Sequence, residues 1–520
     1  MAHDEQREII TFLSRPAAFG LRAGAADRID THISIVWLAG DRAYKLKRAV
    51  RFDYVDFSTS ELRRVACEAE VRLNRRTASA LYRGVIPITR EADGSLALGG
   101  HGAPIDWLVE MARFDQNTLF DRLADCGKLD LSLMEGLADA IVRLHADAER
   151  RQDRGGRGGM AWVIEGNARG FAEHGASALD PGACERVTAD ARRMLGQHED
   201  LLEARRRDGS VRSCHGDLHL RNICLIDGLP TLFDAIEFNE HLSCIDVLYD
   251  LGFLRMDLWR RDLRSHANAV FNEYMTRAAD LRGLALLPLF LSCRAAVRAK
   301  TSVTASNVQP DERQRLDLHA ASRQYLALAR EFLRPPLPCL IAVGGLSGSG
   351  KSTLARGLAS GVGPAPGALI LRSDVIRKAL LGVAPLTRLG PEGYSAAMSR
   401  HLYRTMAERA LTTVEAGHAA IVDAVYGSAN DRDEIASIAR QAGVPFIGLW
   451  LDGPPEMLAR RLQGRVLDAS DATADVLHRQ VLSTVAPLDW HHLDGALDAG
   501  RVRQDAEALC RKWQRQPVES

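Results

Sequence analysis

One eight-residue stretch, Gly-Leu-Ser-Gly-Ser-Gly-Lys-Ser at residues 345–352, constrains the fold of this chain more than any other. It fits the pattern G-x-x-x-x-G-K-[ST], in which glycines let the backbone turn until successive N–H groups point at phosphate oxygens. An apolar run precedes it at residues 339–344, and a helical pattern starts at Ser352. Strand, loop and helix in this order are the context that the motif needs, so the stretch predicts a nucleotide site.

The residues of this loop predicted to bind nucleotide are Gly345, Gly348, Ser349, Gly350, Lys351, Ser352 and Thr353. In such loops the lysine reaches the β- and γ-phosphates, and the serine hydroxyl is a ligand of Mg²⁺. We therefore expect ATP and Mg²⁺ as cofactors of this part of the chain.

Length and composition exclude several classes of protein. The chain has 520 residues, which predicts about three domains or lobes. Lys plus Arg equals Asp plus Glu at 67 each, so no excess charge favours nucleic acid or a membrane surface. The 9 cysteines are scattered without a C-x-x-C pair, and no apolar run is long enough for a signal or a bilayer span. We expect a soluble cytoplasmic protein with no membrane partner.

The N-terminal part of the chain predicts two lobes. Residues 31–47 alternate as in a β-hairpin, residues 60–76 have a helical pattern, and residues 107–111 form another apolar strand candidate. After residue 117 the period is helical, so a strand-rich lobe and a helical lobe would join near residues 110–117.

The middle of the chain predicts a loop and a domain boundary. The Arg-Gly segment at residues 154–159 predicts a mobile surface loop rather than an RNA-binding segment. Helical patterns follow at 183–207 and 284–332, and Arg-Pro-Pro-Leu-Pro at 334–338 ends them at the predicted boundary. Beyond it, three further apolar runs alternate with helical patterns, which predicts a parallel sheet wrapped by helices: residues 369–371, 420–422 and 446–451.

A second phosphate-handling constellation precedes the boundary. His-Gly-Asp-Leu-His-Leu-Arg-Asn at residues 215–222 has the H-x-D-x-x-x-x-N spacing of a kinase catalytic loop. Asp234 ends a short strand downstream, where a metal-binding Asp would lie. Upstream, Ala-Tyr-Lys ending at Lys45 matches A-x-K, and the next helix offers Glu68 and Glu70 as partners. Four elements in this order predict a kinase-like site.

These motifs resemble the aminoglycoside phosphotransferase branch of the protein-kinase-like superfamily over roughly residues 30–330. The resemblance implies that Lys45 holds the α- and β-phosphates and that Glu70 positions Lys45. It also implies that Glu110 and Met111 form the hinge beside adenine. No G-x-G-x-x-G loop precedes the lysine, and Lys47 lies on the same strand face, so both Lys45 or Lys47 and Glu68 or Glu70 stay open.

The same resemblance assigns the catalytic loop. Asp217 would be the base that accepts the proton of the attacking hydroxyl, and Asn222 and Asp234 would bind magnesium. His215 is interpreted as a structural residue that braces the loop, and Asp250 as part of the architecture that follows.

Two carboxylates and several arginines follow the glycine loop. Asp374 ends the predicted second strand, and Arg377 follows at the D-x-x-R spacing, which resembles the polynucleotide-kinase and zeta-toxin-like P-loop kinases over about residues 338–515. That resemblance implies that Asp374 is the base for the acceptor hydroxyl and that Arg377 contacts substrate. A helix N-cap is the alternative for Asp374.

Asp423 ends the third apolar run and resembles the acidic residue of a Walker B strand, which helps to hold magnesium. Three arginines, Arg460, Arg461 and Arg465, fit the lid of such kinases. Among them Arg465 is predicted to stabilise the charge that develops on the transferred phosphoryl group.

Taken together, the sequence predicts an α+β two-lobed protein-kinase-like domain followed by an α/β P-loop domain with a parallel sheet. The predicted boundaries are 1–334, with lobes of about 1–112 and 113–334, and 335–520. This arrangement resembles proteins described as bifunctional aminoglycoside phosphotransferase and ATP-binding fusions.

The predicted function is ATP- and Mg²⁺-dependent transfer of a phosphoryl group to a hydroxyl of a small molecule, with two nucleotide sites. One alternative makes one half a nucleotide-dependent sensor that regulates the other. Another makes the P-loop half a nucleic-acid end kinase, which the balanced charge does not favour. The acceptor and the oligomeric state do not follow from the sequence.

Overall fold

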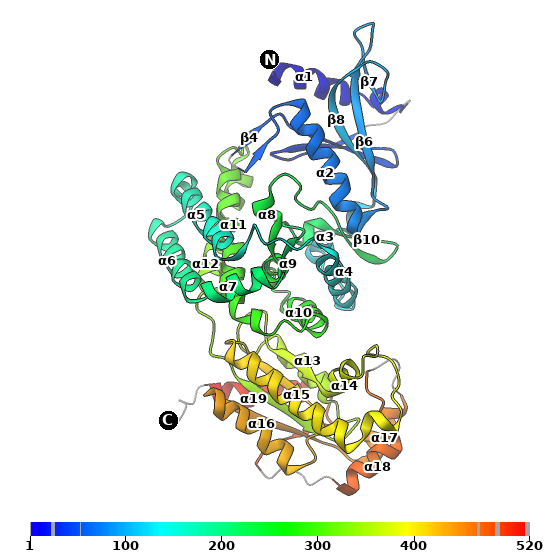
Figure 1. Cartoon of the computed structure of the whole chain (residues 1–520), viewed down its shortest axis with the longest axis vertical. Helices are drawn as coiled ribbons and strands as arrows, with labels where there is room; N and C mark the ends of the chain where they lie inside the picture. Colours follow the sequence, from blue (N-terminus) through cyan, green and yellow to red (C-terminus); the bar gives the residue numbers. More distant parts are fainter. Residues whose placement is uncertain (1, 22–25, 53, 465–468, 484–488, 515–520) are drawn as a thin grey trace. The chain divides into compact units, whose positions relative to one another are not determined.

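The computed structural model describes residues 2–21, 26–52, 54–464, 469–483 and 489–514 (Figure 1). Two compact units divide the chain: residues 1–166 with 195–257, and residues 167–194 with 258–520. Within these described ranges, no helix combines the length and the apolar character needed to cross a membrane.

The first unit contains a six-stranded antiparallel sheet of order β1-β2-β3-β8-β6-β7. Its strands are β1 (Asp27–Asp30), β2 (Ser34–Ala39), β3 (Arg42–Lys47), β6 (Tyr82–Arg90), β7 (Leu96–Leu98) and β8 (Ala103–Ala112). The predicted hairpin is β2–β3, which turns at Gly40 with a φ of 61°, and the predicted strand at 107–111 lies inside β8. Both predictions are confirmed.

Helix α2 (Ser60–Ala78) packs against β6 and β8, as Figure 1 shows. The Thr59 side chain caps its first turn by accepting a hydrogen bond from the backbone N–H of Leu62. Its buried positions recur at helical spacing and include Cys67, Glu70 and Val71. The helix therefore carries the Glu70 carboxylate on the face that packs against the sheet.

The remainder of the first unit is helical, with three short strand pairs. The pairs are β4 (Arg51–Phe52) with β5 (Val55–Asp56), β9 (Val211–Ser213) with β12 (Cys244–Asp246), and β10 (Ile223–Ile226) with β11 (Leu229–Leu232). The helices are α1 (Ala2–Leu13), α3 (Phe120–Asp125), α4 (Leu133–Asp147), α7 (Glu199–Arg207) and α8 (Glu240–Ser243). Three helices contribute residues to both units: α5 (Gly156–His174), α6 (Pro181–Gln197) and α9 (Val247–Arg260).

One expectation for this helical part is wrong. The predicted loop at residues 154–159 is helical from Gly156 onward, because Gly155 and Gly156 turn the chain at positive φ and the Arg157 N–H then donates to Glu203. The predicted helical pattern at 183–207 is confirmed as two helices, which separate at His198.

The second unit contains a five-stranded parallel sheet of order β14-β15-β13-β16-β17. Its strands are β13 (Leu340–Gly345), β14 (Leu369–Arg372), β15 (Ala420–Asp423), β16 (Phe446–Asp452) and β17 (His491–Asp494). Its helices are α10 (Arg264–Ala278), α11 (Leu287–Ser306), α12 (Glu312–Phe332), α13 (Lys351–Ala359), α14 (Ser373–Leu380), α15 (Ala396–Glu415), α16 (Ala429–Ala442), α17 (Pro455–Gln463), α18 (Ala474–Ser483) and α19 (Ala499–Gln514).

The four predicted apolar runs of this unit are strands β13 to β16. The alternation of strands and helices gives the predicted parallel sheet, and the predicted fold class is confirmed. Strand β17 was not predicted, because Leu493 is its one buried residue and no apolar run marks it.

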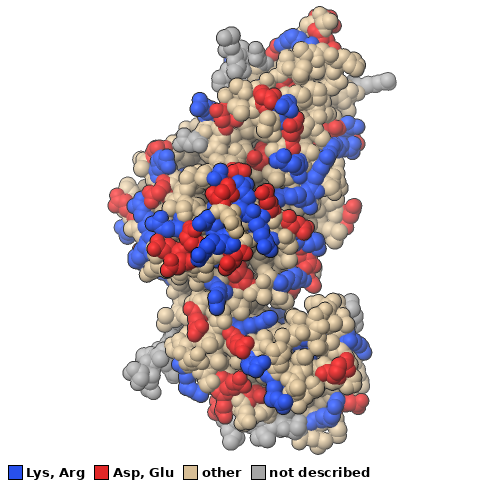
Figure 2. Space-filling model, viewed as in Figure 1, with Lys and Arg blue, Asp and Glu red and all other residues tan. Residues whose placement is uncertain are grey.

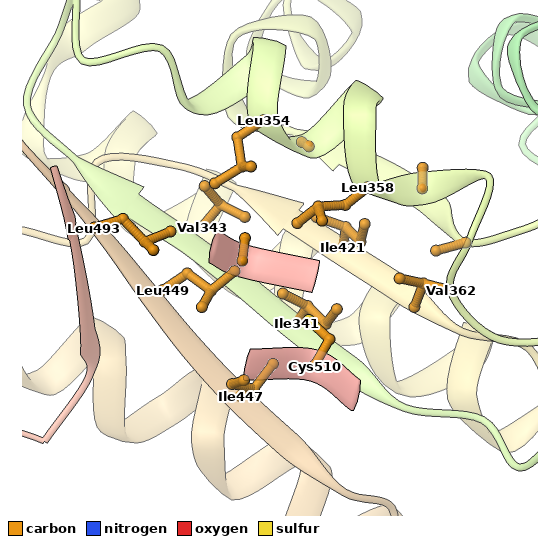
Figure 3. Close-up of a cluster of buried hydrophobic side chains, with 14 of the residues drawn as sticks. Ile341, Val343, Leu354, Leu358, Val362, Ile421, Ile447, Leu449, Leu493 and Cys510 are labelled. Carbon is orange, nitrogen blue, oxygen red and sulfur yellow. The ribbon is translucent and has the colours of Figure 1, made fainter. Parts of the chain in front are cut away.

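Apolar side chains from β13, α13 and the neighbouring strands fill the core beneath the glycine loop (Figure 3). Ile341 and Val343 of β13 pack with Leu354 and Leu358 of α13, and all four are almost fully buried. Burial of each such side chain contributes about 1.5–3 kcal/mol, so β13 and α13 hold the loop between them firmly. The carboxyl ends of β13, β14 and β15 then lie at one edge of the sheet, where ligands bind in this kind of fold.

Helix α10 supplies hydrogen bonds to the edge strand of this sheet. Asn272 accepts a hydrogen bond from the Ile370 N–H at 2.6 Å and donates to the Ala368 carbonyl at 3.2 Å. Asn268 donates to the carbonyls of Pro366 and Ala368. The two amides thus make hydrogen bonds to the edge of the sheet that a further strand would otherwise make, and they hold β14 in position. Strand β14 leads directly into Asp374.

We predict that Asn272→Ala lowers the free energy of unfolding by about 1–3 kcal/mol, because it leaves the partly buried Ile370 N–H without its acceptor. Urea titration of the full-length chain measures this loss. Asn430→Ala, at an exposed position of α16, is the matched control and should change stability by less than about 0.5 kcal/mol. Equal effects of the two substitutions would contradict the pairing.

Candidate phosphoryl-transfer sites

The first candidate site joins β3, α2 and the segment after β11. Lys45 extends from β3, and its Nζ lies 2.9 Å from Glu70 Oε1 and 2.5 Å from Asp234 Oδ1. Glu70 is fully buried on α2, whereas 41% of the Asp234 side chain is exposed. The structure therefore brings the predicted lysine, its glutamate and the predicted metal-binding aspartate together.

Lys47 also contacts Glu70, because alternate residues of a strand share one face. Its Nζ lies 2.6 Å from Glu70 Oε2 and also binds Glu237, which the sequence analysis did not identify. Glu68, the other candidate, lies at the surface and binds Arg64. Of the two glutamates, Glu70 alone therefore contacts a lysine of β3, and it contacts both of them.

The buried charges of this site shift one another's pKa. Burial opposes ionisation of Glu70, but Lys45 and Lys47 outweigh it and lower the pKa of Glu70 to about 2. Burial disfavours the charged form of Lys45 and so lowers its pKa, but Asp234 and Glu70 outweigh burial and hold this pKa well above the ordinary value. Burial raises the pKa of Glu237, and Lys47 opposes this shift. All these groups stay close because each charge would be costly alone.

Asp250 anchors the backbone of the predicted catalytic loop through hydrogen bonds. Its two carboxylate oxygens accept the backbone N–H groups of His215, at 3.1 Å, and Gly216, at 2.9 Å. Gly216 has a φ of 84°, and a Cβ there would lie 2.9 Å from the Leu242 carbonyl oxygen, so only glycine fits. His215 is buried and bonds to the Phe233 carbonyl through Nε2 at 2.9 Å, which agrees with its predicted bracing role.

Asp217 and Asn222 meet at the exposed end of this loop. Asn222 donates from Nδ2 to Asp217 Oδ2 at 3.0 Å and to the Asp217 carbonyl at 2.9 Å. About a third of the Asp217 side chain is accessible, as a base for a diffusing substrate requires.

Asp234 follows β11 in an unusual backbone conformation. Its φ is 62°, and its N–H donates to the Tyr82 hydroxyl at 3.2 Å, while Asn74 accepts from the next N–H at 2.8 Å. The sequence analysis did not identify Tyr82 or Asn74, since both lie far from Asp234 along the chain. Because Phe233 also pairs with Asn222 through the backbone, Asn222 and Asp234 flank one end of the β10–β11 hairpin. Their amide and carboxylate oxygens suit Mg²⁺.

The predicted hinge residues lie at the end of β8. Glu110 binds Arg42, and Met111 is buried in an apolar cluster with Ala43, Cys224 and other residues of β3, α2 and β10. The Glu110 side chain thus has a surface partner, and Met111 lies among the apolar side chains beside Lys45.

The second candidate site is the glycine loop between β13 and α13. Gly345, Gly348 and Gly350 have φ angles of 138°, 87° and 100°. A Cβ on Gly348 would lie 2.7 Å from the Leu458 carbonyl oxygen, so both the turn and the packing need glycine there. The Lys351 Nζ donates to the Leu346 carbonyl at 2.9 Å, so the lysine side chain lies back over the glycine loop.

Two of the predicted nucleotide-binding residues, Ser349 and Thr353, differ in exposure. Ser349 is almost fully buried, whereas Thr353 is exposed on the first turn of α13. Helix α18 also contacts the glycine loop, since the Ser347 N–H donates to the Gln480 side chain at 2.9 Å. No local sequence pattern predicts this contact.

Ser352 and Asp423 form the pair expected of a magnesium site. The Ser352 hydroxyl donates to Asp423 Oδ2 at 2.5 Å, and Asp423 is almost fully buried at the end of β15. Arg372 reaches both, with Nη2 3.4 Å from the Ser352 hydroxyl and Nε 3.7 Å from Asp423 Oδ2. A hydroxyl and a carboxylate oxygen at this spacing fit Mg²⁺, which would polarise the phosphates when bound.

Asp374 is the second residue of α14, directly after β14. The alternative role as N-cap is wrong, because the N-cap position belongs to Arg372. Burial and the nearby Asp423 carboxylate raise the pKa of Asp374, while Lys351, Arg372 and the Ser470 hydroxyl oppose that rise. Asp374 therefore lies within electrostatic reach of Lys351, which is predicted to bind phosphate, and of Asp423, which is predicted to help hold magnesium.

Arg377 lies on the same helix and is 8% exposed. Its Nη1 donates to the Gly393 carbonyl at 2.8 Å, and its guanidinium lies 4.8 Å from the centre of the Tyr394 ring. In the described part of the chain, its Nε atom is buried without a hydrogen-bond partner. Among the predicted lid arginines, Arg461 donates to the Gly495 carbonyl, whereas Arg465 lies outside the described residues.

Comparisons with known proteins match different lengths of the chain. Residues 340–487 match the family described as AAA domain. An uncharacterized protein of Mycobacterium tuberculosis (strain ATCC 25618 / H37Rv) is 29% identical over 483 residues, 90% of this chain and 92% of that protein. The adenylyl-sulfate kinase of Myxococcus xanthus (strain DK1622) is 29% identical over 117 residues, 22% of this chain and 59% of that kinase.

Among solved structures, a choline/ethanolamine kinase family protein from Mesorhizobium loti is similar over 64% of this chain and 99% of its own. Its sequence identity is 14% and the TM-score is 0.37.

We predict that Lys47→Met lowers the free energy of unfolding by about 3–5 kcal/mol, because Glu237 and Glu70 then lose a buried counter-charge. Urea titration of the full-length chain measures the loss. The double variant Lys47→Met/Glu237→Gln should lose less than the single one, because it removes both members of the pair.

Arg64→Ala, which breaks two surface ion pairs of α2, with Glu61 and Glu68, is the control and should cost about 0–1 kcal/mol. Losses that simply add in the double variant would show that Lys47 and Glu237 do not stabilise each other.

A pH prediction follows from the raised pKa of Asp374. A base works only when ionised, so activity should fall as the pH drops through a value above the ordinary aspartate pKa of about 3.9. Arg372→Met removes a positive charge that lowers this pKa, so the acidic limb should move to higher pH. The measurement is kcat/KM for ATP turnover against pH in an Asp217→Asn background. Arg440→Met, at an exposed position of α16, should leave the low-pH fall of the kcat/KM profile unchanged. If Arg372→Met does not shift this fall either, the assignment of Asp374 as the base is contradicted.

Proposed function

We propose that this protein is an ATP- and Mg²⁺-dependent phosphotransferase with two nucleotide sites in one chain. Each site would transfer the γ-phosphoryl group to a hydroxyl of a small molecule. We place this activity in the cytoplasm, which supplies ATP.

One observation carries the proposal: each half gathers the same three chemical groups. In the kinase-like half they are Lys45, Asp234 and Asp217, and in the P-loop half they are Lys351, Asp423 and Asp374. A cation for phosphate, a carboxylate for the metal and a second carboxylate for the acceptor proton are what phosphoryl transfer to a hydroxyl requires. A similar kinase, the adenylyl-sulfate kinase of Myxococcus xanthus, supports this reaction class for the P-loop half.

We further propose that the acceptor of the P-loop half carries an anionic group besides its hydroxyl. Arg377 supports this, because its buried Nε lacks a hydrogen-bond partner within the described residues, while its Nη1 donates to Gly393 and its guanidinium lies over the Tyr394 ring. A buried donor without a partner is costly, and a carboxylate, sulfate or phosphate of the acceptor would satisfy it.

A nucleic-acid acceptor has less support. Lys and Arg balance Asp and Glu at 67 each, and on the face in Figure 2 the two signs are intermingled. Nucleic-acid surfaces concentrate positive charge instead.

The test assays phosphoryl transfer by full-length variants with labelled ATP, Mg²⁺ and fractionated small metabolites. Lys351→Ala should remove one set of labelled products, with a loss of rate on the order of 10²–10³, because a phosphate-directed cation is missing. Asp217→Asn should remove a different set by roughly 10²–10⁴, because the base is missing while ATP binding survives.

The double variant should give no labelled product. Wild-type transfer by the double variant would refute the proposal for both halves. A single product set that depends on Lys351 but not on Asp217 would identify the kinase-like half as a nucleotide-dependent sensor. Arg64→Ala is the control for non-specific loss.

A further inference from the structure

A second histidine of the catalytic loop, His219, contacts the predicted base. His219 lies two residues after Asp217 and directly before the short 3₁₀ turn Leu220–Asn222. Its Nε2 atom lies 3.3 Å from Asp217 Oδ2, and 9% of its side chain is exposed. The sequence analysis assigned no role to this residue.

The surroundings of the His219 ring determine which nitrogen carries the proton. Nε2 faces a carboxylate oxygen, which can only accept, so Nε2 must donate. Nδ1 is buried without a hydrogen-bond partner in the part of the chain that the structure describes, and the ring lies edge-on to Phe253 with centres 5.2 Å apart. A proton on Nδ1 would be a buried donor with no acceptor, so the tautomer with hydrogen on Nε2 fits this site better than the one with hydrogen on Nδ1.

His219 and Asn222 approach the same atom: the His219 Nε2 lies 3.3 Å from Asp217 Oδ2, and the Asn222 Nδ2 donates to that oxygen at 3.0 Å. Two nitrogen groups that approach one oxygen from different residues restrict the rotation of the carboxylate. The backbone ties the same three residues together, because the His219 N–H donates to the Asp217 carbonyl at 3.0 Å and the Asn222 N–H to the His219 carbonyl at 2.9 Å.

We propose that His219 is a positioning residue for phosphoryl transfer in the kinase-like half. Through its Nε2–H it holds the Asp217 carboxylate in one orientation, so that the acceptor hydroxyl meets a base already aligned. This inference rests on the proposed function of Asp217 as that base. Misalignment of a reacting group is costly in rate, whereas ATP binding depends on the lysine and metal ligands.

The kinetic test uses the full-length chain with Lys351→Ala, which silences the P-loop half, and follows Mg²⁺-dependent ATP turnover. His219→Leu should lower kcat by on the order of 10-fold to 100-fold with little change in KM for ATP. His219→Gln keeps an N–H donor near the same point and should recover most of that loss. His219→Leu added to Asp217→Asn should cause no further loss, because it acts through Asp217.

His101→Leu, at an exposed position between β7 and β8, is the matched control and should leave kcat unchanged. An unchanged kcat in His219→Leu, an equal loss in His219→Gln, or losses that add to that of Asp217→Asn would each overturn the positioning role.

A spectroscopic test stands apart from activity. Nitrogen-15 spectra of histidine-labelled protein, assigned by comparison with His219→Gln, should show the neutral tautomer with hydrogen on Nε2, and Asp217→Ala should perturb this signal. Hydrogen on Nδ1, or a signal that Asp217→Ala does not change, would overturn the inference. If the Lys351→Ala protein shows no turnover that depends on Asp217, the proposed function of this half fails. The tautomer result then decides whether the His219–Asp217 contact exists.

Discussion

The carboxylate of Glu70 lies between the buried Lys47 and the partly buried Lys45, and the sheet-bearing part of the first unit is organised around this contact. An isolated charge away from water is far too costly, so strand β3, helix α2 and the segment from Asp234 to Glu237 must meet. That requirement places Asp234 beside the lysine that is predicted to hold phosphate. Loss of Lys47 would therefore disturb the site as well as the fold.

The P-loop half satisfies a similar requirement with a different scaffold. There, Asp374 begins the helix after β14, Asp423 ends the neighbouring strand β15, and both lie near Arg372 and Lys351 at the carboxyl edge of the sheet. Burial and, after it, the Asp423 carboxylate raise the pKa of Asp374, and the cations oppose the rise. Two different sheets in one chain thus each contribute to a cluster of a lysine and carboxylates.

Local signals made much of this arrangement predictable from the sequence. Glycines at fixed spacing predicted the loop between β13 and α13, and apolar runs predicted strands β13 to β16. The missing parts depend on contacts between distant residues. Glu237 meets Lys47 across 190 positions and Asp234 meets Tyr82 across 152, and no local pattern encodes either contact. Strand β17 escaped prediction because it buries a single residue, Leu493.

The central claim, two nucleotide sites in one chain, is tested most directly by the stoichiometry of binding. Titration calorimetry of the full-length protein with a non-hydrolysable ATP analogue and Mg²⁺ should give two equivalents per chain. One equivalent should disappear with Lys351→Ala and the other with Lys45→Ala. A single equivalent in the unmodified protein, or two equivalents that survive both substitutions, would contradict the account.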